Sequence, residues 1–182
     1  MSETLTRSFG TPDLEVRSAE QRIISGIAVP YGVHQRINPR LTECFARGAF
    51  NRQLDAAHRV KVAREHLSLG GSLIGRVVEL RDDAKGLYAE MRISETPLGD
   101  ETLELVRDGA LTDLSIGFLE RQNRKLAGGV IERTTAHLAE IAIVLQGAYG
   151  EGAMVSGVRS DNATPNLDAA AQVLAQMPVL SA

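Results

Sequence analysis

The sequence predicts a mainly β fold with helices (α+β), in the form of a closed antiparallel β-barrel with a few helices packed around it. Two observations carry this prediction. About seven or eight short stretches are β-branched or alternate apolar with polar residues, which is the period of a strand. Most of these stretches are separated only by hairpin-length turns, which favours antiparallel pairing over helix-linked parallel pairing.

The composition narrows the function classes. The chain of 182 residues is 43% hydrophobic and 24% charged, as in an ordinary globular domain. Its net charge of -3 offers no basic field for nucleic acid, and no apolar run is long enough to cross a bilayer. The single cysteine, Cys44, excludes an internal disulfide and indicates a reducing compartment. Cys44 remains an alternative nucleophile, although no sequence neighbour marks it as activated.

The first half of the chain predicts a short helix among strands. Residues 1–19 mix Thr, Ser, Gly, Pro and charge, which is typical of a flexible arm. Residues 33–41 are polar and indicate a loop, whereas Phe50, Leu54 and Ala57 fall at helical spacing and predict a short helix from near Ala49. The expected strands are 21–30, 42–45 and 59–66, and 14–17 could form one further short strand.

The second half predicts a hairpin, a capped helix and a last group of strands. Thr96 is suited to cap a helix that has Pro97 at its first position and that Gly109 ends. From residue 160 the chain is rich in Ala, Asn, Asp and Pro, so 160–182 is predicted to be a flexible tail or linker and 20–159 the folded domain. The expected strands are 73–80, 86–93, 111–120, 130–135 and 136–145.

Four side chains suggest hydrolytic chemistry. By alternation, Ser115 and Gly117 point away from the apolar face of their strand, and Glu140 leaves the apolar face of the last strand in the same way. A serine nucleophile needs a base within hydrogen-bond reach and a third group that orients the base. His66 at a strand end is the candidate base, and Glu140 or His137 the third group.

Each of these residues also has a purely structural interpretation. Ser115 would then fill a small gap on a sheet, His66 would cap a turn, and His137 would be a solvated strand residue. Glu140 is harder to explain in this way, because a charge in an apolar run needs a partner. The sequence has no GxSxG, HExxH or CxxC motif, which disfavours an α/β-hydrolase and a zinc site.

Six segments, in order, resemble the prohead (capsid maturation) proteases of tailed bacteriophages. Together with a closing segment at Ala148 and 153–155, the resemblance runs from about residue 20 to 159. The six segments are 25–32 (Ser-Gly-Ile-Ala-Val-Pro-Tyr-Gly), 43–50 (Glu-Cys-Phe-Ala-Arg-Gly-Ala-Phe), His66 with Ile74 and Gly75, Gly86 with Leu87, 114–118 (Leu-Ser-Ile-Gly-Phe) and 138–144 (Leu-Ala-Glu-Ile-Ala-Ile-Val).

This resemblance implies a serine endopeptidase with the fold of the herpesvirus assemblins, a β-barrel ringed by helices. It implies Ser115 as nucleophile and His66 as general base. The third member is placed at Glu140, where the assemblins use a second histidine, with His137 as the runner-up. The chain departs from the family at Leu67, where Asp is frequent, and at Ala142, where Ser is frequent.

The implied substrates are the major capsid protein and its scaffold segment. Cleavage of N-terminal segments is expected inside the immature shell, in the host cytoplasm, with self-cleavage before residue 20 or after residue 160. No cofactor, metal, nucleic acid or membrane is implied, and a homodimer is suggested by analogy with the assemblins. Two other functions remain: a catalytically inactive capsid-assembly factor of the same fold, and an unrelated serine hydrolase of small esters.

Overall fold

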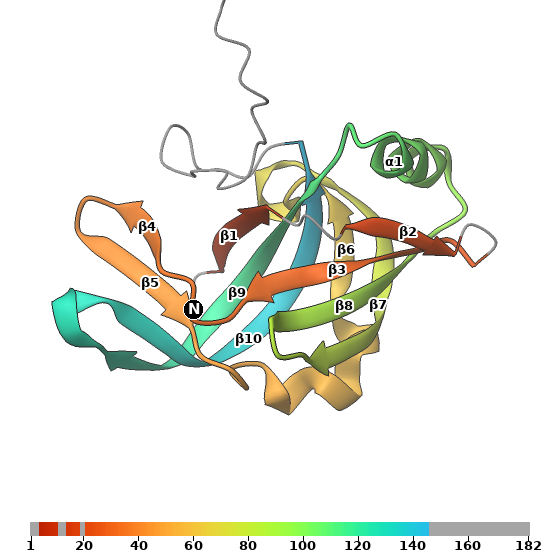
Figure 1. The fold of residues 1–182 in the computed structure, drawn as a ribbon. Helices are drawn as coiled ribbons and strands as arrows, with labels where there is room; N and C mark the ends of the chain where they lie inside the picture. Colours follow the sequence, from red (N-terminus) through yellow and green to blue (C-terminus); the bar gives the residue numbers. More distant parts are fainter. Residues whose placement is uncertain (1–3, 11–13, 19–20, 146–182) are drawn as a thin grey trace, which may run out of the picture.

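A computed structural model describes residues 4–10, 14–18 and 21–145, whose strands belong to one strongly curled sheet (Figure 1). The sheet path runs through β1 (Leu5–Gly10), β9 (Asp113–Lys125), β10 (Ile131–Val144), β6 (Lys61–Arg64), β7 (Ser72–Asp82), β8 (Gly86–Ile93), β3 (Ile23–Pro30) and β2 (Glu15–Ser18). Off this path, β4 (Gln35–Asn38) pairs with β5 (Leu41–Phe45), and β5 pairs with β10.

The prediction of a closed antiparallel barrel is wrong in two respects. The path ends at β1 and β2, and within the described residues these strands do not pair with each other, so the sheet is a curled half-barrel. The pairing is also mixed, because β10 is parallel to both β5 and β6. Hairpin-length turns predict which neighbours are antiparallel, but they contain no information on pairings between strands distant in sequence.

The predicted helices are present at the margins of the sheet. α1 (Pro97–Arg107) is capped as expected, since Thr96 Oγ1 accepts a hydrogen bond from the backbone N–H of Gly99 at 3.1 Å. The helix predicted near Ala49 is the 3₁₀ helix η1 (Asn51–Arg59), and two 3₁₀ turns, η2 (Leu67–Leu69) and η3 (Ala127–Gly129), join strands. No helix in the described ranges is long and apolar enough to span a bilayer.

Several strands differ from their predicted limits. β10 is one strand of 14 residues where the sequence predicts two, because β-bulges around Thr135 interrupt its register without ending it. β4 lies in the predicted loop, since pairing with β5 needs no apolar alternation. β1 lies in the predicted arm, whereas β2 corresponds to the short strand expected over 14–17; both extend the sheet. The tail predicted over 160–182 lies outside the described residues.

The core fills the inside of the curl and holds the central strands in place. Phe45 stacks on Phe50 with centroids 5.5 Å apart and meets Phe118 edge-on at 5.1 Å. Leu114, Ile116 and Phe118 are all fully buried on this side, which confirms the predicted apolar face of β9. The far ends of β9 and β10, with β4 and β5, project to one side (Figure 1). Because the apolar side chains of β9 pack on the core side, its other face can hold polar groups.

Candidate active site

A row of small side chains crosses the sheet on the face opposite the main core. Ser115 of β9 lies directly between Ser8 of β1 and Ala142 of β10, and Ala142 in turn faces Ala63 of β6. Residues paired in this way across neighbouring strands lie on the same face of a sheet. The hydroxyl of Ser115 is thus set among small side chains.

Three of the predicted site residues, Ser115, His66 and Glu140, meet beside this row. His66 Nε2 lies 2.5 Å from Ser115 Oγ, and His66 Nδ1 lies 2.7 Å from Glu140 Oε1. Ser115 is 0% exposed, His66 5% and Glu140 6%, so water is almost excluded from both hydrogen bonds. The structure does not bring His137 to this group: its side chain is exposed, and it pairs with Leu119 of β9.

The other candidate nucleophile, Cys44, is buried in β5. Burial raises the pKa of its thiol, and the nearby carboxylates of Glu132 and Glu43 raise it further. A raised pKa keeps the thiol protonated and unreactive at neutral pH. The geometry therefore favours the hydroxyl of Ser115 over this thiol.

A strained backbone turn aims His66 at the sheet. Glu65, at the end of β6, has a φ of 58°, which is uncommon for a residue with a side chain. Its N–H donates to the carbonyl of Ile143 at 3.1 Å, and the carbonyl of His66 accepts from Leu69 and Gly71 at 2.9 Å each. A Cβ on Gly71 would lie 2.3 Å from the Glu65 carbonyl oxygen, so only glycine fits there. The sequence indicates this turn but not the reversal at Glu65.

Glu140 is positioned by a bulge and by a glycine. The register of β10 against β9 shifts between Leu138 and Glu140, and Glu140 then lies opposite Gly117. A Cβ on Gly117 would lie 2.8 Å from Glu140 Cγ and 3.2 Å from Oε1, so the carboxylate occupies the space that the glycine leaves. In the structure the space beside Gly117 therefore holds the side chain of Glu140.

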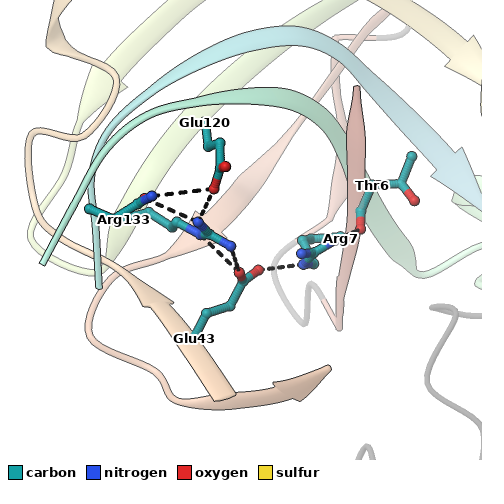
Figure 2. Close-up of polar contacts among 6 residues, drawn as sticks. Thr6, Arg7, Glu43, Glu120 and Arg133 are labelled. Carbon is teal, nitrogen blue, oxygen red and sulfur yellow. Dashed lines mark hydrogen bonds and ion pairs between the residues drawn. The ribbon is translucent and has the colours of Figure 1, made fainter. Parts of the chain in front are cut away.

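A second buried polar cluster, which the sequence did not indicate, lies on the other side of β1. The Glu43 carboxylate, 1% exposed, accepts from Arg7 Nε and from Arg133 Nε, the latter at 2.9 Å. Arg133 also pairs with Glu120, as Figure 2 shows. This cluster links β1, β5, β9 and β10 through groups that are neutralised pairwise.

A hydroxyl, an imidazole and a carboxylate joined in this order are the side chains that serine hydrolases use. Within the described ranges, His, Cys, Asp and Glu side chains form no group of three or more that could hold a metal ion. The fold and the site thus combine a curled β sheet with the side chains of a serine hydrolase.

The chain belongs to the Caudovirus prohead serine protease family, whose sequence profile matches residues 12–165. Among solved structures, it is similar to the capsid assembly protease gp21 of bacteriophage T4, with a TM-score of 0.53 and 14% sequence identity over 79% of this chain and 98% of that chain. At this identity the likeness shows a shared fold. No curated protein matches the sequence.

Proposed function

We propose that this chain is a serine endopeptidase that cleaves scaffold or capsid-protein N-terminal segments, inside the immature phage shell in the host cytoplasm. The observation that carries the proposal is the hydrogen-bonded chain from Ser115 Oγ through His66 to Glu140, with separations of 2.5 and 2.7 Å. Its family supports a protease of capsid maturation. The T4 neighbour, described as a capsid assembly protease, agrees with that role.

In the proposed acylation step, Ser115 Oγ attacks the carbonyl carbon of the scissile peptide while its proton passes to His66 Nε2. The Oγ–C bond forms and the carbonyl π electrons move to oxygen, giving a tetrahedral intermediate. When that intermediate collapses, the C–N bond breaks and His66 returns the proton to the leaving amine. The product is an acyl-enzyme on Ser115 and a free C-terminal fragment.

Deacylation repeats the same steps with water. His66 takes a proton from water, and the hydroxide adds to the acyl carbon. The bond between the acyl carbon and Ser115 Oγ then breaks, and His66 returns the proton to Oγ. Glu140 accepts a hydrogen bond from His66 Nδ1–H throughout. Its negative charge stabilises the imidazolium, and the 2.7 Å contact holds the ring in the tautomer that leaves Nε2 free to accept a proton.

The test is co-expression with the major capsid protein and its scaffold, followed by intact-mass spectrometry of the assembled shells. We expect shortened capsid or scaffold chains with the wild type and full-length chains with Ser115→Ala. Ser94→Ala, at an exposed serine at the end of β8, is the matched control and should cleave as the wild type does. Cleavage that persists in Ser115→Ala rejects the assignment. Shells that assemble with the wild type without any shortening indicate the inactive assembly factor instead.

We further propose that the protease cuts its own chain, before residue 20 or after residue 160. Expression of the chain alone, followed by intact-mass measurement, is expected to yield shortened species for the wild type and the full 182 residues for Ser115→Ala. A full-length wild type under conditions in which it shortens the capsid protein would contradict self-cleavage while leaving the capsid protease activity intact.

A further inference from the structure

The proposed nucleophile is covered by a strand of the same chain. β1 is the end strand of the sheet and runs antiparallel along β9, with Ser8 directly opposite Ser115. Ser8 Oγ donates a hydrogen bond to Ser115 Oγ at 2.7 Å, and Ser115 is fully buried. In this arrangement no peptide can reach Ser115, because β1 occupies the edge of β9 from which an extended chain would approach.

Side chains on either side of Ser8 anchor β1 to the protein. Arg7, 8% exposed, is paired with the buried Glu43 carboxylate (Figure 2). Its guanidinium lies 5.5 Å from the ring centroid of Phe118. Phe9, 4% exposed, packs edge-on against Phe45 at 6.3 Å. β1 therefore places a basic side chain beside Glu43 and a large apolar one beside Phe45, while Ser8 points toward the proposed catalytic residues.

The residues that surround the Arg7 side chain are held in place without β1. Arg133 of β10 binds the Glu43 carboxylate through Nε and Nη2, at 2.9 and 2.5 Å, so Glu43 keeps a partner when Arg7 leaves. Glu120 and Asn123 of β9 accept hydrogen bonds from Nη1 of Arg133. The Glu43 carboxylate beside the edge of β9 is thus held by β5, β9 and β10 alone.

An exposed strand edge binds an extended peptide by main-chain hydrogen bonds, and pockets for alternate side chains then select its sequence. β1 pairs with the edge of β9 and places alternate side chains beside Glu43 and Phe45. On this basis, and resting on the proposed endopeptidase function, we propose that β1 occupies the substrate site. Substrate peptides then add to the same edge of β9 with a basic residue beside Glu43, immediately before the residue that faces Ser115. A large apolar residue follows immediately after, against Phe45.

Because β1 is tethered to the domain, it competes with substrate at a high effective concentration. The covered state is then the resting state of the full chain, and weakening β1 exposes Ser115. Arg7→Glu sets a second carboxylate against Glu43 in a buried site, which detaches the strand most strongly. Arg7→Lys keeps the charge, and Arg7→Gln removes it with little change in length.

The experiment measures the rate at which a fluorophosphonate probe labels Ser115 in the full chain, by peptide mass spectrometry; in this reaction Ser115 Oγ displaces fluoride from phosphorus. We expect labelling to be at least about tenfold faster in Arg7→Glu than in the wild type, intermediate in Arg7→Gln and closest to the wild-type rate in Arg7→Lys. Arg22→Glu, which makes the same charge change at an ion pair with Asp100, is the matched control and should label as the wild type.

A synthetic peptide of residues 1–14 tests the sequence preference directly. Added in excess, it should slow the labelling of the Arg7→Glu chain at least fivefold, and the same peptide carrying R7E should not. Equal labelling of Arg7→Glu, Arg7→Gln and the wild type, while capsid precursor is still cut, overturns this inference and leaves the proposed function standing. If Arg7→Glu does not fold, Arg7→Gln decides the point. No labelling of Ser115 in any variant, with uncut precursor, overturns both.

Discussion

Replacing Gly117 with alanine should disable the site without unfolding the protein. The added Cβ would lie 2.8 Å from Glu140 Cγ, against at least about 3.4 Å for an ordinary contact, so the Glu140 side chain must move by roughly 0.6 Å or more. A shift of this size takes Oε1 beyond good hydrogen-bond range of His66 Nδ1, from which it now lies 2.7 Å away.

The lost interaction sets the magnitude. A hydrogen bond to a charged group contributes about 1.5–3 kcal/mol, which corresponds to a fall of about 10- to 150-fold in kcat/KM. Stability should change by less than about 1 kcal/mol, because alanine restricts the unfolded chain by about 0.4–1 kcal/mol and so offsets part of the repacking. The measurements are the cleavage rate of a capsid-precursor peptide and the midpoint of urea unfolding.

A double-mutant cycle isolates the route of the effect. If Gly117→Ala acts through Glu140, it should have little further effect in a Glu140→Ala background, because the group that it displaces is already gone. Full activity in Gly117→Ala refutes the steric argument. The same fold-loss in both backgrounds refutes the role given to Glu140.

Three further predictions test the third site residue, a surface carboxylate and the buried ion cluster. Glu140→Gln should lower kcat by about 10³- to 10⁴-fold, as expected for an imidazole held in the wrong tautomer, whereas His137→Ala should retain wild-type turnover; the reverse order would make His137 the third residue. The pKa of Asp82 is below its usual range because, against the opposing effect of burial, Arg47 and the N–H of Gly48 stabilise its charge. The ionised Asp82 therefore stabilises the fold above about pH 4, and this stabilisation is lost as the pH falls through the lower pKa of the folded state. The urea midpoints of wild type and Asp82→Asn should converge in acid, and a difference that does not vary with pH would contradict this. Arg133→Ala should cost about 3 kcal/mol of unfolding free energy, since Glu43 stays buried with one partner fewer, whereas Arg124→Ala at an exposed pair should cost less than about 1 kcal/mol in the same titration.

The sequence predicts those features that depend on local periodicity. The alternation around Ser115 assigns Leu114, Ile116 and Phe118 to the core and the hydroxyl to the opposite face, as found. The same rule places Glu140 on that face. Ser115 and Glu140 could therefore be proposed without coordinates, since each depends on which side of its own strand it leaves. The aim of His66 could not, because it depends on the reversal at Glu65 after the end of β6.

Features that depend on pairing over long distances could not be predicted in this way. β1 pairs with β9 although Ser8 and Ser115 are 107 residues apart, and no periodic pattern in the polar segment around Ser8 indicates a partner. The bulge at Ala139 and the space above Gly117 become meaningful only once the two strands are in register. Closure of the barrel is a further such feature, because strand count and turn length do not show which strands lie at the two ends of the sheet.

The position of β10 at the end of the described chain has a consequence for biosynthesis. This strand supplies Glu140 and joins β9 to both β5 and β6, so Ser115 and His66 have no shared framework until it has been translated. Before Val144 emerges from the ribosome, β9 can pair with β1 and β6 with β7, but the strand that brings the hydroxyl and the imidazole together is missing. The proposed hydrolysis of peptide bonds therefore cannot start on a nascent chain that still lacks this strand.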